Sequence, residues 1–106
     1  MVDRETFTAM AMSLAGTTAA PHFERLAFKV KRTYATLAAD GLSANLKLGP
    51  DEQDFKCAVA PDIFEAIPNR WGRQGWTTID LSRATVDDVA AALAMAHAHA
   101  LPRPRA

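Results

Sequence analysis

The chain has 106 residues, of which 49% are hydrophobic and 23% charged, and its formal net charge is zero at pH 7. This length predicts one domain with one hydrophobic core, and the zero net charge excludes a strong overall attraction to nucleic acid. The single cysteine, Cys57, excludes an intrachain disulfide and a cysteine-based metal cluster, which favours a reduced cytosol. We find neither a signal peptide nor a membrane span of ~20 apolar residues, and we expect a cytoplasmic protein.

A first helix is predicted to begin after the N-cap Asp3 and to end near Leu14, before Gly16. Its apolar residues recur with helical spacing and form one stripe for the core: Phe7, Met10, Ala11 and Leu14. The small residues at positions 15–22 then predict a loop, whose exit is stiffened by Pro21.

Three antiparallel strands are expected next, because the hydrophobic period changes to two. They cover residues 25–30, 33–38 and 42–48, and Asp40-Gly41 is the hairpin signal before the third. This alternation gives the sheet one apolar face and one polar face. The polar face and the first turn carry the basic residues Arg25, Lys29, Lys31, Arg32 and Lys47, together with Asn45. Such a face either binds a negatively charged partner or protects the strands against aggregation.

A second helix is predicted over residues 50–60, with Phe55 and Val59 as its core contacts. Residues 62–67 form either a fourth strand or an irregular segment. Pro68, which follows directly, argues against a central place for that strand in the sheet.

Charge is unevenly distributed along the chain. Residues 23–48 hold five basic and two acidic side chains, whereas residues 49–66 hold five acidic side chains and one lysine. A basic block therefore precedes an acidic block, and a solvated surface of mixed sign is the simplest interpretation of the two.

Residues 68–81 contain both tryptophans, Trp71 and Trp76, together with Gly72 and Gly75, which permit a sharp turn and close backbone approach. Trp76 is expected in the core at the start of a strand. Trp71 either contacts a ligand or folds back to close the sheet edge. The other polar residues that suit contacts to phosphates or bases here are Asn69, Arg70 and Arg73.

A last strand is predicted over residues 76–81, followed by a helix that Thr85 caps, with Asp88 at its third position. The inner face of this helix is expected to comprise Val86, Val89, Ala90, Leu93 and His97. Residues 102–106 are expected to form a disordered basic tail after a single domain over residues 1–101.

No catalytic arrangement stands out in the sequence. His97 and His99 are two residues apart on a helix, so they face different directions and do not form a metal pair. His97 is expected at the edge of the core. Neither a phosphate-binding glycine loop nor a dinucleotide fingerprint is present. We therefore expect no enzymatic activity, no cofactor and no metal.

The tryptophan segment also carries a family resemblance. It reads Pro68-Asn69-x-Trp71-Gly72-x-x-Gly75-Trp76-Thr77 and, with stretches such as Leu46-Lys47-Leu48, resembles the MmcQ/YjbR family of small bacterial proteins. The resemblance implies a two-layer α+β fold similar to bacterial frataxin (CyaY-like), with an antiparallel sheet and the N- and C-terminal helices packed on one face. Members of this family are commonly described as DNA-binding.

Two functions are compatible with these features. The first is a non-catalytic module that binds DNA weakly, in a salt-sensitive way and largely without sequence preference. The residues predicted to carry it are Arg25, Lys29, Lys31, Arg32, Lys47, Asn69, Arg70, Trp71 and Arg73. The alternative is a protein-interaction or small-ligand module with Trp71 as its anchor. In either case we expect a monomer that does not contact a membrane.

Overall fold

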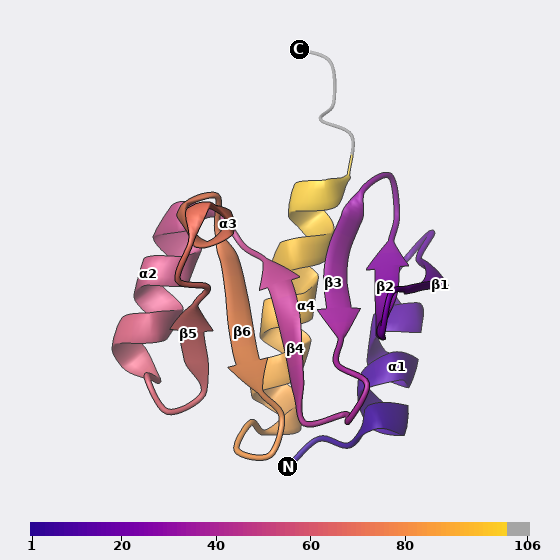
Figure 1. Cartoon of the computed structure of the whole chain (residues 1–106), viewed down its shortest axis with the longest axis horizontal. Coiled ribbons are helices and arrows are strands. Elements are labelled where there is room, and N and C mark those ends of the chain that lie inside the picture. The colour runs from indigo at the N-terminus through magenta and orange to yellow at the C-terminus, as the bar shows by residue number, and fades with distance from the viewer. Residues whose placement is uncertain (102–106) are drawn as a thin grey trace.

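The computed structural model describes residues 1–101, so the predicted tail at 102–106 lies outside the described residues. The elements, in chain order, are α1 (Arg4–Met12), β1 (Thr18–His22), β2 (Arg25–Lys29), β3 (Thr33–Leu37), β4 (Ser43–Lys47), α2 (Pro50–Val59), β5 (Phe64–Ala66), α3 (Arg70–Arg73), β6 (Trp76–Asp80) and α4 (Val86–Ala100). Figure 1 shows their arrangement.

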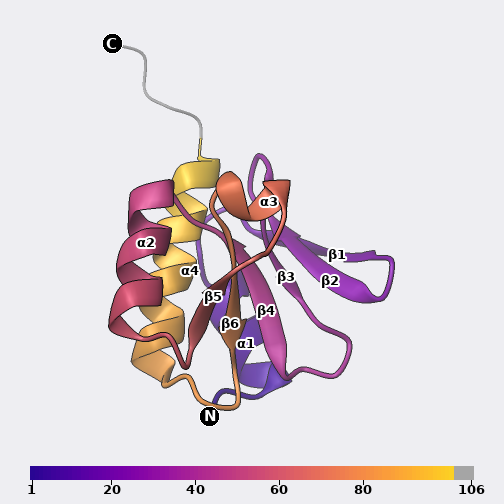
Figure 2. The ribbon, with the colours of Figure 1, turned by 60° about the vertical axis from the view of Figure 1, so that its left-hand side comes forward.

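The strands form one antiparallel sheet with the order β1-β2-β3-β4-β6-β5. Figures 1 and 2 show α1, α2 and α4 on the same face of this sheet, which leaves most of the opposite face uncovered. α4 contacts β3 and β4 at the centre, α1 packs beside α4, and α2 lies next to β5 at one edge. The predicted two-layer α+β fold is thereby confirmed.

The core lies between these helices and the sheet. Its largest fully buried side chains include Phe7, Phe28, Tyr34, Leu46, Leu48, Ile79, Leu81 and Leu93. The alternation predicted for the third strand is confirmed, because Ala44 and Leu46 of β4 are buried whereas Asn45 and Lys47 are half-buried on the other face. Each large apolar side chain buried in this way contributes roughly 1.5–3 kcal/mol.

Tyr34 occupies a bulge in β3. Phe28 pairs with Ala35 while the next residue of β2, Lys29, pairs with Thr33, so Tyr34 is the extra residue. Its hydroxyl makes a 2.8 Å hydrogen bond with the hydroxyl of Thr17 and donates to the carbonyl of Ala11 at 3.3 Å. The bulge thus turns a polar tip towards the end of α1, where its hydrogen-bonding groups are satisfied.

Both predicted N-caps are confirmed. The Asp3 carboxylate accepts a hydrogen bond from the Thr6 amide at 2.8 Å. At the start of α4, the Thr85 hydroxyl accepts from the Asp88 amide at 3.1 Å, and the Asp88 carboxylate accepts from the Thr85 amide at 2.9 Å. This reciprocal capping box satisfies donors that the first helical turn leaves free.

The loop predicted over residues 15–22 is wrong in part, because it contains β1. This strand is exposed along its whole length and pairs with β2 at the edge of the sheet. Its small residues show no hydrophobic alternation, so the sequence carries no strand signal there. Pro21 is tolerated because an edge strand has a side without ladder hydrogen bonds.

The core contacts predicted for the second helix are also wrong. Phe55 and Val59 are 62% and 65% exposed, whereas the polar Gln53 is only 7% exposed. In α4, Val86 and Ala90 are likewise exposed. The buried residues of α4 are Val89, Ala92, Leu93, Ala96, His97 and Ala100. The possible fourth strand is present as the short edge strand β5.

Candidate nucleic-acid interface

Six of the predicted basic residues lie at one end of the sheet. At this end the turn between β2 and β3, the end of β4, α3 and the start of β6 come close to the last turn of α4 (Figure 1). We call this group the basic end; it comprises Lys29, Lys31, Arg32, Lys47, Arg70 and Arg73. Within residues 1–101, salt bridges join only Arg83 to Asp80 and His99 to Glu52. The cations of the basic end therefore lack carboxylate partners among the described residues.

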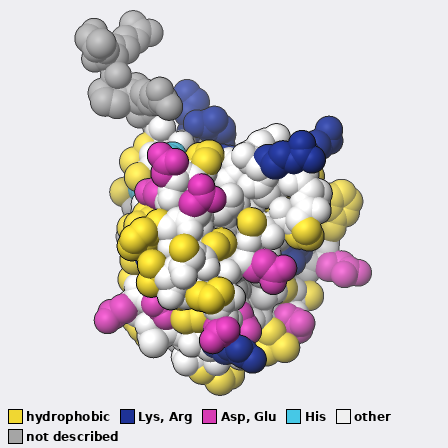
Figure 3. All heavy atoms as spheres, turned by 90° about the vertical axis from the view of Figure 1, so that its left-hand side faces the viewer, with side chains coloured by type: hydrophobic (Ala, Val, Ile, Leu, Met, Phe, Trp, Pro, Cys, Tyr) yellow, Lys and Arg dark blue, Asp and Glu magenta, His cyan; other side chains and the backbone are white. Residues whose placement is uncertain are grey.

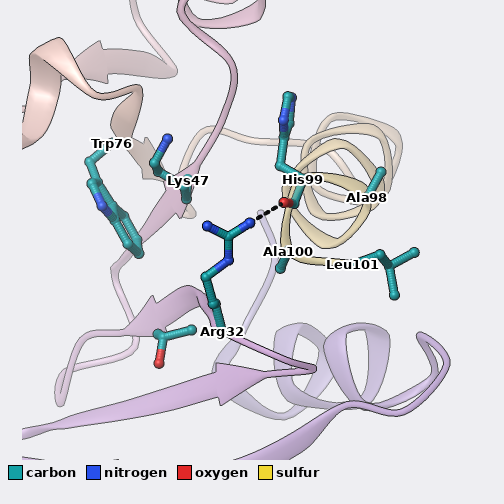
Figure 4. Close-up of a pocket in the computed structure, with 8 residues that line it drawn as sticks. Arg32, Lys47, Trp76, Ala98, His99, Ala100 and Leu101 are labelled. Atoms are coloured by element: carbon teal, nitrogen blue, oxygen red, sulfur yellow. Dashed lines mark hydrogen bonds between the residues drawn. The ribbon is translucent and has the colours of Figure 1, made fainter. Parts of the chain in front are cut away.

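A pocket of about 430 Å³ opens among the residues of this end. It is lined by Arg32, Thr33, Lys47, Trp76, Ala98, His99, Ala100 and Leu101. Figure 4 shows the indole of Trp76 on one side and the last turn of α4 on the other, with the guanidinium of Arg32 between them. The pocket therefore combines an aromatic wall with two cationic groups, which is a suitable environment for a planar or anionic ligand.

Arg32 and Lys47 are held in place by backbone carbonyl groups. The guanidinium of Arg32 donates to the carbonyl of His99 at 3.3 Å, and the ammonium of Lys47 donates to the carbonyl of Gln74. Burial lowers the pKa of Lys47, and the charge of Arg32 lowers it further. Because two cations repel each other here, an anion placed between them would gain an attraction to both.

Glu52 lies behind this pocket rather than in it. Its carboxylate makes a 2.7 Å contact with Nε2 of His99 and accepts a 3.0 Å hydrogen bond from the amide of Gly49. Burial acts to raise the pKa of Glu52, but these two hydrogen bonds and the charges of His99 and Lys56 outweigh it and lower the pKa. The carboxylate that contacts the pocket residue His99 is thus engaged by His99 and by the start of α2.

The glycines of the tryptophan segment shape its backbone. A Cβ atom at Gly72 would overlap the carbonyl of Ile67, and one at Gly75, where φ is +108°, would overlap the carbonyl of Leu48. The predicted close backbone approach is therefore confirmed at both positions. Asn69 acts as the N-cap of α3, because its side chain accepts from the backbone amide two residues later at 2.8 Å.

Trp71 lies on the surface of α3 and is 48% exposed. The guanidinium carbon of Arg70 lies 5.6 Å from the centroid of its ring, within the range of a cation–π interaction. Trp71 therefore presents an aromatic surface beside a cation. Trp71 is thus not sealed in the core, and its predicted contact with a ligand stays a prediction.

Trp76 differs from its prediction. It is half-buried and lines the pocket, whereas the following residue, Thr77, is fully buried on the core side of β6. Trp76 pairs with Lys47 across β4 and β6, so both side chains lie on the same face. The alternation of residues 76–81 was the signal that could have identified this pocket residue, since it groups Trp76 with Thr78 and Asp80 rather than with Ile79.

Arg25 lies apart from the basic end. It begins β2, next to the hairpin with β1, whereas the basic end begins where β2 finishes. Its guanidinium donates to the hydroxyl of Thr36 at 2.9 Å and to the carbonyl of Thr36 at 3.2 Å. The side chain of Arg25 therefore lies against β3, away from the other predicted site residues.

The described residues contain neither a metal site nor a membrane helix. Within residues 1–101, no group of three or more His, Cys, Asp or Glu side chains is placed to hold a metal ion. In the same part of the chain, no helix has the length and apolar character needed to cross a membrane. His97 lies at the edge of the core as predicted, with its Nε2 2.8 Å from the carbonyl of Ala15.

Comparison with known proteins supports the resemblance. A family model described as YjbR matches residues 12–99. A crystal structure of a Deinococcus radiodurans protein with the DUF419 domain is 20% identical, covers 88% of this chain and 74% of its own, and superposes with a TM-score of 0.74. A Pseudomonas syringae protein is 12% identical, with coverage of 94% and 100% and a TM-score of 0.70. No match was found among proteins with curated descriptions. At these identities, the two structures establish the fold alone.

Proposed function

The chain belongs to the YjbR family, and we propose that it is a non-catalytic module that binds nucleic acid weakly and largely without sequence preference. The observation that carries this proposal is the basic end, where six cations lack carboxylate partners among residues 1–101 and two of them, Arg32 and Lys47, line a pocket with an indole wall. Lys and Arg side chains attract phosphates irrespective of base sequence, and aromatic rings stack on any base.

The pocket favours single strands within this proposal. Its volume of about 430 Å³ is in the range of small-ligand sites. A base that is already unstacked can lie against the indole of Trp76, with the adjacent phosphate between Arg32 and Lys47. Bases in a duplex are stacked on their neighbours, so a duplex base would have to be unstacked, at a cost in free energy, before it could enter the pocket. Duplex DNA is then limited to phosphate contacts with the outer cations of the basic end.

The zero net charge is compatible with weak binding through a local surface. The acidic block lies mainly on α2 and β5, which form another side of the molecule. Figure 3 shows this side, with acidic side chains distributed around hydrophobic ones. The acidic block begins beside the basic end, where Glu52 contacts the pocket residue His99. Salt screens those charges of the block that lie beyond about 10 Å from a bound phosphate.

A salt titration of binding tests the proposal. Labelled single-stranded DNA of two unrelated sequences should bind with similar affinity, and affinity should fall steeply between about 50 and 200 mM salt. The double variant Lys31→Gln/Arg32→Gln should reduce the slope of log K against log salt by about 1.4, which corresponds to two lost contacts on a single strand.

The matched control removes two cations outside the basic end, as Arg4→Gln/Arg83→Gln. This control should keep the wild-type affinity and slope, and circular dichroism should confirm that both double variants are folded. Undetectable binding at low salt would refute the proposal. An equal loss in the control variant would refute the assignment to the basic end.

A further inference from the structure

The helix α2 is oriented with apolar side chains towards solvent. Phe55 and Val59, which are four residues apart and therefore adjacent on the helix surface, are 62% and 65% exposed. Ala58 lies beside them and is exposed as well. We call these three residues the α2 apolar face. Figure 3 shows this side of the molecule, where hydrophobic side chains gather.

Polar and electrostatic contacts hold α2 in this orientation. The buried side chain of Gln53 donates to the carbonyl of Gly72 at 2.9 Å and to the carbonyl of Trp76 at 3.1 Å. One turn further on, the ammonium of Lys56 lies 5.6 Å from the centroid of the Phe64 ring. The inner face of α2 is thereby fixed against α3, β5 and β6. The exposure of the apolar face follows from this anchoring.

The surroundings of the apolar face are acidic. Asp51 and Asp54 lie on the same outer side of α2, Asp62 follows the helix, and Glu65 lies on the edge strand β5; all four are exposed. The one lysine between residues 49 and 66 is Lys56, which is directed at Phe64. A partner for this face therefore meets apolar groups at the centre and negative charge around them.

We propose that the α2 apolar face binds a basic amphipathic helix of another protein, with paired apolar residues against Phe55 and Val59 and Lys or Arg on its flanks. Amphipathic helices are recognised through apolar anchors three and four residues apart, the spacing that a partner for Phe55 and Val59 would use. A second copy of the chain fits less well: antiparallel packing of two α2 helices would place Asp51 near the partner's Asp62, and like charges at an interface are unfavourable. Charge complementarity thus selects the basic partner.

A synthetic peptide tests this inference. The probe is a labelled helical peptide in which Leu recurs with a period of 3.6 residues and all remaining positions are Lys. The control peptide has Glu in place of each Lys. The Lys peptide should bind, and the Glu peptide should bind at least about tenfold more weakly, a difference of about 1.4 kcal/mol.

Variants locate the contact. Phe55→Ser/Val59→Ser should weaken binding of the Lys peptide by about tenfold or more, because both central apolar anchors of the contact are truncated. The matched control is Val86→Ser, which changes a side chain 53% exposed on α4 and should leave peptide affinity unchanged. Lys31→Gln/Arg32→Gln should bind the peptide with wild-type affinity. Failure of peptide binding at α2 can therefore be distinguished from failure of nucleic-acid binding at the basic end.

Three results would overturn the inference. Equal affinity for the Lys and Glu peptides would remove the electrostatic selection. Wild-type affinity in Phe55→Ser/Val59→Ser would show that the peptide binds elsewhere. Sedimentation that reveals a dimer of the wild type, lost in the same double variant, would show that a second copy covers this face.

Discussion

The side-chain amide of Gln53 in α2 donates a hydrogen bond to the backbone carbonyl of Gly72 in α3 at 2.9 Å. The same nitrogen also donates to the carbonyl of Trp76 at 3.1 Å. One polar side chain thereby joins α2, α3 and the first residue of β6. Because Trp76 lines the pocket, this bond network supports the base of the candidate interface and also sets the orientation of the α2 apolar face.

Replacement of Gln53 by Leu should lower the free energy of unfolding by about 1–3 kcal/mol, because two side-chain hydrogen bonds worth about 0.5–1.5 kcal/mol each are lost. The two carbonyls keep a second donor in the amides of Gly75 and Ile67. Urea denaturation followed by circular dichroism measures this change. The exposed Gln74 provides the control, and Gln74→Leu should change the free energy by less than about 0.5 kcal/mol. A Gln53→Leu protein as stable as the wild type would show that the two hydrogen bonds contribute nothing net.

Gln53 also explains why the orientation of α2 was predicted incorrectly. The sequence assigns Phe55 and Val59 to the core, since apolar side chains are buried more often than amides. The opposite result depends on the carbonyls of Gly72 and Trp76, which lie 19 and 23 residues further along the chain. No local pattern encodes such a partner.

Features that depend on neighbouring residues were predicted well. The alternation in β4 and the capping box of Thr85 and Asp88 are fixed by spacing within a few residues. The assembly of the pocket is different, because Arg32, Lys47 and His99 come from three separate elements. Local alternation predicts which face of the sheet a side chain such as Lys47 occupies. The residues meet only because the strand order and the position of the last turn of α4 place them side by side, and neither is encoded locally.

Gly72 should tolerate no side chain. A Cβ atom there would overlap the carbonyl oxygen of Ile67, a backbone atom that cannot move without displacing β5 from β6. Gly72→Ala should therefore lower the free energy of unfolding by about 1–3 kcal/mol, as overpacking does elsewhere. Urea denaturation measures the loss. Unchanged stability would contradict the close approach.

Glu52 should make stability depend on acid pH. Its pKa is lowered in the folded protein, so its stabilising contribution is present above the unfolded pKa of about 4.3 and is lost as pH falls through the folded value. The stability difference between wild type and Glu52→Gln should reach at most about 1 kcal/mol near neutral pH, because the side chain is 34% exposed and solvent screens such a partly exposed pair.

That difference should disappear as the pH falls below the folded pKa of Glu52. Urea midpoints measured over a pH series test this, with Asp54→Asn on the outer side of the same helix as the control. A difference that stays constant with pH would mean that Glu52 acts through packing rather than through its charge.

Trp76 should distinguish binding of single strands from binding of duplex DNA. Trp76→Leu removes the aromatic wall of the pocket but keeps the six cations of the basic end. Single-strand affinity should fall by about 5- to 150-fold, which corresponds to the 1–3 kcal/mol of one stacked base. Duplex affinity should change by less than about twofold, since phosphate contacts carry it. Fluorescence anisotropy measures both, and Phe55→Leu, an exposed aromatic change on α2, is the control. Equal losses for both forms of DNA, in a variant whose circular dichroism matches the wild type, would exclude base stacking on Trp76.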